Sequence, residues 1–336
     1  MSGVEARGTG SCLLTGCAGF IGSHVAEALL ERGDSVIGVD NLGGDLGLSR
    51  VSQARTAETA KEKNLALLSG RPGFDFQKLD IRDMAQLKAL SGKDVKSVIH
   101  LAALVGVRAS IEDPRSYFDT NVMGTLNMLE LARRLGPRAF VLGSSSSVYG
   151  DSDKVPFSET DRTDSPISPY AASKKACEVA CYTYSRSYRL PVTCLRFFTV
   201  YGPRGRRDMA PFKFMDAISK GRSIDVYGDG TSERDYTFVG DIVAGVLAAS
   251  DKLFDFEIIN LGNSDPISLD GFIKVIEEVV GNKATRVGKP RQPGDVMRTC
   301  ADVSKGKRLI GYSPRTGLRE GLEAMYSWYV SEADPR

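Results

Sequence analysis

Short apolar runs rich in β-branched and aromatic residues alternate with helix-length amphipathic segments through the first part of the chain. Helical patterns such as 116–135 and 170–188 separate most of these runs. Such alternation predicts right-handed βαβ units, and the continuous apolar character of the runs predicts strands buried on both faces. The sequence therefore predicts an α/β fold with a doubly wound parallel sheet. Its expected strands lie within residues 12–15, 35–40, 74–80, 97–103, 139–145 and 192–198.

The pattern becomes less regular after residue 200, where Pro and Gly cluster at 202–205 and again at 288–294. Ligands of open α/β sheets bind outside the carboxyl ends of the strands. We therefore expect residues 1–200 to form a sheet domain that also carries the catalytic helix. Residues 201–336 are expected to form mainly a smaller α/β substrate-binding lobe, with some strands returning to the sheet.

The charge balance excludes several classes of protein. The chain has 336 residues with 44 Lys+Arg and 42 Asp+Glu, a net charge of +2, whereas nucleic-acid and membrane-surface binders carry a concentrated basic excess. No apolar run approaches the roughly 18 residues of a membrane helix, and the start has no signal-peptide core. The six cysteines contain no C-x-x-C pair and the two histidines have no ligand cluster. We therefore expect no metal site, and a reducing, cytoplasmic location.

A glycine-rich turn, TGCAGFIG at 15–22, lies between the first expected strand and the first helix. Glycines permit a tight turn and let backbone N–H groups approach a pyrophosphate at the helix N-terminus. The spacing G-x-x-G-x-x-G and its position in a βα unit predict a Rossmann-type dinucleotide site. The residues expected to line it are Gly16, Gly19, Phe20, Ile21 and Gly22.

Acidic residues follow the second and third expected strands. Asp40 lies 24 residues after Gly16, where a carboxylate binds the adenosine ribose hydroxyls and repels a 2′-phosphate. This favours NAD over NADP. Asp80 and Ile81 are expected to flank the adenine.

A Ser/Tyr/Lys group forms the second candidate site. Tyr170 and Lys174 are four residues apart on one helix face, and a cation beside a phenol favours the phenolate that a general base requires. A Y-x-x-x-K pair is also common on solvated helix faces. Serines at 144–147 end the fifth expected strand and offer hydroxyls to a reacting oxygen, and Pro169 fits the first turn of the helix. Together these features favour a catalytic site.

With these motifs in place, the chain resembles the extended short-chain dehydrogenase/reductase superfamily over nearly its whole length, and within it the NAD-dependent nucleotide-sugar epimerases. Segments 106–114 and 199–214 are most similar to UDP-glucuronate 4-epimerases. The motifs that carry the wider resemblance are TGCAGFIG, the pair Asp40 and Asn41, HLAA at 100–103, Asn121, SSSSVYG at 144–150, SPYAASKKA at 168–176, RFFTVYGP at 196–203, RDYTFVGDI at 234–242 and QPGDV at 292–296.

The resemblance implies a bound NAD that is regenerated in each turnover, a UDP-sugar substrate and a homodimer. It adds Asn41, Leu101, Ala102, Ala103, Asn121, Tyr170 and Lys174 to the expected cofactor contacts.

The resemblance also implies roles at the sugar. Ser145 and Tyr170 would contact the 4-hydroxyl, with Tyr170 as the base and Lys174 tuning it. The expected substrate-binding residues are Ser146 and Ser147 at the sugar, Thr199, Arg206 and Arg108 at the C6 carboxylate, Arg234 at the diphosphate, and Gln292 and Asp295 near the nucleotide.

The expected reaction removes the 4-hydroxyl proton while C4 gives a hydride to NAD, and the 4-keto intermediate takes the hydride back on its other face. With glucuronate this intermediate is a β-keto acid, so holding its carboxylate away from alignment with the carbonyl π system would suppress loss of carbon dioxide. Arg206 and the serines are the candidate clamp because guanidinium forks match carboxylates.

Other activities of the same scaffold remain as alternatives. Related decarboxylases and 4,6-dehydratases carry an acidic residue directly after the active-site hydroxyl, whereas positions 145–147 are serines. The alternatives are therefore UDP-glucose or UDP-N-acetylglucosamine 4-epimerisation, and UDP-glucuronate decarboxylation. A non-catalytic NAD sensor is disfavoured by the intact Tyr170 and Lys174. Arginines within 204–207 are a poor nucleic-acid footprint.

Overall fold

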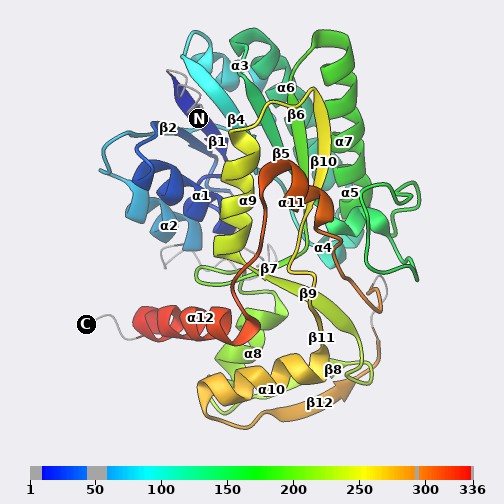
Figure 1. Ribbon diagram of the computed structural model, residues 1–336. Coiled ribbons are helices and arrows are strands. Elements are labelled where there is room, and N and C mark those ends of the chain that lie inside the picture. The colour runs from blue at the N-terminus through cyan, green and yellow to red at the C-terminus, as the bar shows by residue number, and fades with distance from the viewer. Residues whose placement is uncertain (1–9, 44–58, 292–294, 334–336) are drawn as a thin grey trace, which may run out of the picture.

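Seven parallel strands form the main sheet of the computed structural model, which describes residues 10–43, 59–291 and 295–333. The strand order β10-β6-β5-β4-β1-β2-β3 confirms the expected doubly wound α/β fold (Figure 1). The strands are β1 Ser11–Thr15, β2 Val36–Asp40, β3 Phe74–Lys78, β4 Val95–His100, β5 Ala139–Ser145, β6 Val192–Phe197 and β10 Phe256–Leu261.

Helices cover both faces of this sheet because successive strand residues point to opposite sides. In β1, Leu14 packs into one buried cluster and Leu13 into the other. Cluster members place four helices on the Leu14 face and three on the Leu13 face (Figure 1). These are α1 Phe20–Glu31, α2 Ala60–Leu68, α9 Val239–Ser250 and α11 Ser304–Ile310 on the first, and α3 Met84–Leu87, α6 Gly124–Leu135 and α7 Pro169–Tyr188 on the second.

One expected helix is built differently from a single regular helix. The pattern at 116–135 divides into α5 (Pro114–Tyr117), a π-helical turn over 118–123 and α6. Asp113 begins α5 by accepting a hydrogen bond from the backbone N–H of Ser116 at 3.3 Å, with Pro114 in the first turn. A shorter helix, α4 (Val107–Glu112), precedes it. The π-helical turn carries Asn121 toward the carboxyl edge of the sheet, as the contacts below show.

The smaller lobe starts at that same edge, since β7 (Thr199–Tyr201) follows β6 after the single residue Phe198. Its core includes Tyr236 stacked on Phe272, with ring centroids 4.1 Å apart. In Figure 1 it lies beneath the carboxyl ends of the main sheet. Its other elements are α8 Ala210–Ser219, β8 Ser223–Tyr227, β9 Glu233–Phe238, β11 Pro266–Ser268, α10 Leu269–Val280, β12 Thr285–Lys289 and α12 Leu318–Ala333.

Candidate functional site

The glycine turn is closed so tightly that Gly16 and Gly22 cannot carry side chains. Gly16 has φ +75°, and a Cβ there would lie 2.8 Å from the backbone N of Ala102. A Cβ on Gly22 would lie 2.0 Å from the carbonyl oxygen of Gly16. Gly19 precedes α1 and has no side chain to cap it. Backbone N–H groups therefore dominate the amino end of α1, as a pyrophosphate site requires.

Asp40 ends β2 beside this turn, and its carboxylate is buried. It accepts hydrogen bonds from the backbone N–H groups of Ala18 at 3.3 Å and Leu42 at 2.9 Å. Lys61 of α2 donates to the same carboxylate at 2.8 Å. The backbone contacts fix the carboxylate at the strand end, where a ribose would lie, and Lys61 is a partner that the sequence pattern did not indicate.

Asp80 follows β3 and lies next to Asn41, the residue after Asp40. The Asn41 side-chain amide donates to Asp80 at 3.1 Å. Hydrogen bonds from Arg82 lower the pKa of Asp80 to about 2, so the carboxylate is ionised at neutral pH. Ile81 is buried against Gly124 of α6. The acidic strand ends and Ile81 thus line one side of the edge, as expected for an adenosine site.

The end of β4 is held by a neutral histidine. Thr15 Oγ1 lies 2.6 Å from His100 Nδ1 and accepts a hydrogen bond from the backbone N–H of Ala102 at 3.2 Å. His100 Nε2 lies 3.1 Å from Thr125 Oγ1. Complete burial lowers the pKa of His100 to about 3, and the charge on Lys174 acts in the same direction. This bonding fixes the segment with Leu101, Ala102 and Ala103 directly beside the glycine turn.

Asn121 joins that segment to α7, the helix that carries Tyr170 and Lys174. Its side-chain oxygen accepts from the backbone N–H of Leu104 at 2.7 Å. Its amide donates to the Leu104 carbonyl at 3.0 Å and to Ser173 Oγ at 2.9 Å. Asn121 is fully buried, and its hydrogen bonds hold the backbone at Leu104 against α7.

Tyr170 and Lys174 lie on α7, whose start is capped by Ser168 with Pro169 in the first turn. Lys174 is buried and donates from Nζ to the carbonyl oxygen of Gly143 at 2.7 Å. Ser145 lies only two residues further along β5 than Gly143. The part of α7 that carries Tyr170 and Lys174 therefore packs against the serine-rich end of β5. The Tyr170 ring meets the edge of the Tyr117 ring, with centroids 6.2 Å apart.

The serines at 144–147 do not share one environment. Ser145 caps a 3-10 turn over 146–149: its Oγ accepts from the backbone N–H of Ser147 and donates to Ser147 Oγ, both at 3.1 Å. Ser146 and Ser147 are partly exposed. Ser144 points to the opposite side and donates to Glu178 at 2.8 Å. Ser145 to Ser147 are therefore the hydroxyls at the strand end.

Arg206 lies near Gly106 and Tyr117, on the side of α7 that carries Tyr170. It forms a two-point ion pair with Asp208, 2.9 Å from Nε to Oδ1 and 2.5 Å from Nη2 to Oδ2. A Cβ on Gly106 would lie 3.3 Å from Arg206 Nη2 and 3.6 Å from the Tyr117 hydroxyl. Tyr117 in turn contacts Tyr170, so Arg206 lies one aromatic side chain away from the expected base. Burial raises the pKa of Tyr117 to about 12.

The remaining expected substrate residues lie at the lobe. Thr199 starts β7 and is paired with Tyr236 of β9, the strand that also carries Arg234. Arg108 pairs with Asp295 at 3.4 Å and lies over the Tyr227 ring, 5.2 Å from its centroid. Arg234 donates to the carbonyl oxygens of Glu233 at 2.9 Å and Met297 at 3.3 Å. Arg108, expected at the C6 carboxylate, thus pairs with Asp295, which is expected near the nucleotide. Gln292 lies outside the described residues.

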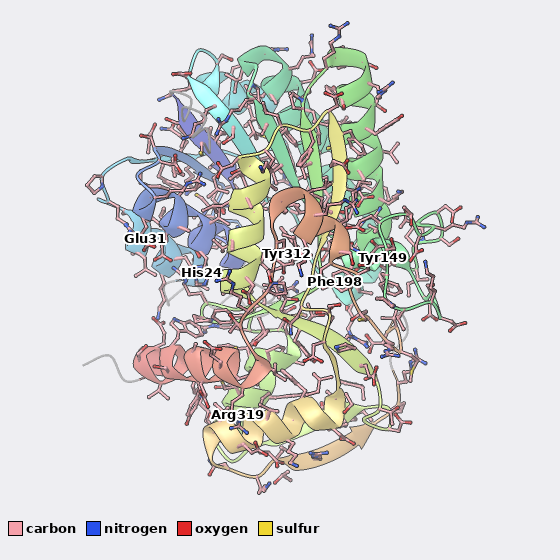
Figure 2. The ribbon with its side chains drawn as sticks, in the orientation of Figure 1. His24, Glu31, Tyr149, Phe198, Tyr312 and Arg319 are labelled. Carbon is pink, nitrogen blue, oxygen red and sulfur yellow. The ribbon has the colours of Figure 1, made fainter. Side chains whose placement is uncertain are left out.

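Arg204 is in the same loop as Arg206 but points the other way. It forms an ion pair with Glu27 and a hydrogen bond with His24, both on α1. Figure 2 shows His24 on the lower part of α1, facing the lobe. Burial lowers the pKa of His24 to about 4. Arg204 therefore anchors the loop to the helix that follows the glycine turn.

Four side chains of the site were not identified from the sequence. Glu178 follows Lys174 by four residues, so the i, i+4, i+8 spacing on α7 was a usable signal. Asp208 lies two residues after Arg206, but nothing local indicated an ion pair. Lys61 and Tyr117 reach the site only through tertiary packing. Within the described ranges, no group of three or more His, Cys, Asp or Glu side chains is arranged to hold a metal ion.

Comparison with known proteins gives consistent matches. The family described as GDP-mannose 4,6 dehydratase matches residues 13–325. A UDP-glucuronate 4-epimerase from Thermodesulfobacterium geofontis is 42% identical, covering 95% of this chain and 96% of the relative. The UDP-glucuronic acid 4-epimerase from Bacillus cereus, solved with UDP-glucuronic acid and NAD, has a TM-score of 0.86 at 34% identity, covering 96% and 99% of the two chains. A UDP-glucose 4-epimerase from Thermotoga maritima, solved with UDP-glucose, also has a TM-score of 0.86, at 31% identity and covering 96% and 100%.

Proposed function

This chain belongs to the GDP-mannose 4,6 dehydratase family, and from that premise we propose that it is an NAD-dependent UDP-glucuronate 4-epimerase. The reaction interconverts UDP-glucuronate and UDP-galacturonate. The relatives bear out the resemblance to nucleotide-sugar epimerases that the sequence motifs indicated. The observation that carries the proposal is the position of Arg206, which lies near Gly106 and near Tyr117, the ring that contacts Tyr170. At this site residues 145–147 are all serine and supply no carboxylate.

The residues present fit NAD. The crowded glycines Gly16 and Gly22 leave only backbone at the amino end of α1, where a pyrophosphate is favoured. Asp40, held by backbone N–H groups, suits ribose hydroxyls and disfavours a 2′-phosphate. Bound by these residues, NAD would supply reversible hydride transfer at C4 of the sugar.

The protein's own residues handle the proton and orient the sugar. Tyr170 removes the proton of the 4-hydroxyl and later returns it, and Lys174 lies one helical turn further along the same face of α7. The Lys174 hydrogen bond to Gly143 fixes the ammonium against β5. The Ser145 hydroxyl, which donates to Ser147 in this structure, turns to donate to the reacting oxygen, and Ser146 and Ser147 bind the sugar beside it.

Arg206 and these serines hold the carboxylate. A guanidinium has two edges that can each donate two hydrogen bonds, and Asp208 occupies the Nε–Nη2 edge. The Nη1–Nη2 edge is then the one oriented for the substrate. Fixing the carboxylate keeps its bond to C5 out of alignment with the 4-keto π system, which suppresses decarboxylation. We further propose that Thr199 assists at the carboxylate, while Arg234, Asp295 and Gln292 bind the UDP moiety. Arg108, which the resemblance placed at the carboxylate, we assign to the UDP moiety instead, because it pairs with Asp295.

The second candidate is 4-epimerisation of a neutral UDP-sugar, which the Thermotoga maritima structure with UDP-glucose supports. The two candidates differ at Arg206, which has a carboxylate to bind in UDP-glucuronate and no charged group to bind in a neutral sugar. Decarboxylation and dehydration are weaker candidates, since residues 145–147 supply no general acid beyond the hydroxyls.

We also propose that the enzyme is a cytoplasmic homodimer. Exposed apolar side chains lie on α7 (Val179 and Tyr182) and on the π-helical turn that packs against it (Phe118 and Met123). Such a patch is typical of an interface between subunits. All six cysteines are buried and free, which fits a reducing compartment. Of the helices in the described ranges, none combines the length and apolar character needed to cross a membrane.

The direct test of the function is incubation of the purified protein with UDP-glucuronate, with products identified by proton NMR and UDP-glucose in parallel. Formation of UDP-galacturonate without UDP-xylose is the expected result. UDP-xylose as the main product would contradict the carboxylate clamp, and turnover of UDP-glucose alone would favour the neutral-sugar alternative. For the dimer, light scattering after size exclusion should show a monomer for Val179→Glu; a monomeric wild type would contradict the interface.

A further inference from the structure

A buried ion pair lies directly behind the strand-end serines. Glu178 of α7 and Arg196 of β6 are each 1% exposed. Two hydrogen bonds join them, Nε to Oε1 and Nη2 to Oε2, both 2.8 Å long. Neither side chain is part of the NAD or sugar contacts proposed above, so the pair requires its own explanation.

This ion pair contacts both ends of the serine segment. At the start, Ser144 donates from Oγ to Glu178 Oε1 at 2.8 Å. At the end, the Arg196 guanidinium lies over the ring of Tyr149, 4.7 Å from its centroid. The residues between these two contacts are the three serines Ser145, Ser146 and Ser147 and the buried Val148. One rigid pair therefore determines where both ends of the segment lie.

The far end of the segment is fixed further by Tyr149. Its hydroxyl donates to Asn260 of β10 at 2.7 Å, and its ring stacks on Phe157 with centroids 4.7 Å apart. Figure 2 places Tyr149 close to Phe198, at the level where the main sheet meets the lobe. Arg196 thus contacts Tyr149, a side chain that is itself held by Asn260 of β10 and by Phe157.

The helix adds a second fixed point one turn away. Lys174 binds the carbonyl of Gly143, and Glu178 binds the side chain of the next residue, Ser144. The two contacts on successive turns of α7 set both the height and the rotation of the strand end relative to the helix that carries Tyr170.

Stability alone does not account for a buried charged pair at this position. Desolvating two charges is costly, and apolar residues of similar volume often stabilise a fold equally well or better. Arg196 even leaves Nη1 buried without a hydrogen-bond partner among the residues that the structure describes. The charged groups instead make directional contacts that apolar residues could not make: Glu178 with Ser144, and Arg196 with the ring of Tyr149.

We propose that Glu178 and Arg196 are positioning residues that hold the Ser145 and Ser147 hydroxyls at the distance from Tyr170 that the sugar requires. The inference rests on the proposed function for the identity of the sugar. It adds that the ion pair controls both the hydride step and retention of the carboxylate. A displacement of about 1 Å at such a site costs on the order of 100-fold in rate.

The test replaces both charges at once, because removing one partner strands a buried charge and destabilises the fold. The double variant E178M/R196M keeps apolar volume but loses the directional contacts. The matched control is D34N/K96M, which removes another buried ion pair at the opposite end of the sheet, with side chains 4% and 8% exposed. Ser144→Ala cuts only the serine contact and serves if the double variant fails to fold.

In E178M/R196M we expect kcat for epimerisation to fall tenfold to 100-fold, with unchanged bound NAD and with UDP-pentose among the products. D34N/K96M should change Tm but neither kcat nor the products, and Ser144→Ala should lower kcat severalfold. A folded E178M/R196M or Ser144→Ala enzyme with wild-type kcat and product ratio would overturn the proposal.

Failure of the proposed function is distinguishable from failure of this inference. If the wild type accepts only UDP-glucose, the fall in kcat is measured with that substrate and only the pentose readout is lost. A crystal structure of E178M/R196M with the Ser145 and Ser147 hydroxyls unmoved would overturn the positioning role, whatever the substrate.

Discussion

Replacing Arg206 by glutamine should separate charged from neutral substrates more clearly than any other single change. The side chain is 16% exposed, and its fork is already oriented by the two-point pair with Asp208. Glutamine removes the charge and all but one donor group. It also leaves the Asp208 carboxylate, 26% exposed, beside the position proposed for the carboxylate of the sugar.

The expected magnitude follows from the number of contacts. A hydrogen bond to a charged group contributes about 1.5–3 kcal/mol. Two such bonds, reduced for partial solvent exposure and non-additivity, amount to about 2–4 kcal/mol. At about 1.4 kcal/mol per tenfold, kcat/KM for UDP-glucuronate should fall by roughly 30-fold to several hundredfold. Arg206→Lys keeps the charge without the fork and should lose about tenfold.

The assay compares kcat/KM for UDP-glucuronate and UDP-glucose by proton NMR, with UDP-pentose quantified in the same spectra. The UDP-glucose value should change less than threefold or so, and the pentose fraction should rise because the carboxylate is no longer fixed. Arg207→Gln is the matched control, an exposed arginine in the same loop that lies over Phe212. Equal losses for both UDP-sugars, or an equal effect of Arg207→Gln, would refute carboxylate recognition by Arg206.

Three further predictions test the base, the glycine turn and the buried histidine. Tyr170→Phe should lower kcat by about 100-fold to 10,000-fold with little change in Tm, measured by NMR turnover and thermal unfolding; retention of more than a tenth of the activity would exclude Tyr170 as the base. Gly22→Ala should lower Tm and abolish NAD binding, measured by calorimetry, because its Cβ would overlap the Gly16 carbonyl, whereas Gly288→Ala, with open space around it, should do neither. His100 has a folded-state pKa of about 3, against 6.5 for an unperturbed histidine. As the pH falls, the unfolded state therefore binds a proton before the folded state does. The free energy of unfolding should consequently fall by about 2–3 kcal/mol between pH 6 and pH 4. Urea titrations at both pH values check this, and His100→Gln should reduce that loss; an unchanged loss would show that other groups cause it.

Local sequence patterns determined the parts of this protein that depend on neighbouring residues. The alternation of apolar runs and amphipathic segments fixed the order of strands and helices, because hydrophobic periodicity is a local property. The spacing of the glycines at 16, 19 and 22 and of Tyr170 and Lys174 likewise reflects one turn and one helix. For that reason the fold class, the cofactor turn and the Tyr/Lys pair could be predicted without a structure.

The departures from expectation occur where a local pattern allows more than one geometry. The amphipathic pattern at 116–135 fits a regular helix, yet the structure inserts a π-helical turn at 118–123. Packing favours this turn because it places the Asn121 amide between Leu104 and Ser173. Hydrophobic periodicity cannot reveal a π-helical turn, since the turn changes the face on which only a few residues lie.

Tertiary structure alone decided which charges meet. Arg204 and Arg206 are two residues apart and have the same chemistry, but one pairs with Glu27 on α1 and the other with Asp208 beside Tyr117. Arg108 is drawn to Asp295, 187 positions away. A side chain's partner is set by the backbone positions that strand order and loop closure bring together, and charge type in the sequence carries no information about that distance. Residue types and their local spacing thus determined the chemistry available to this protein, and the packing of the lobe against the sheet decided which residues are placed to perform it.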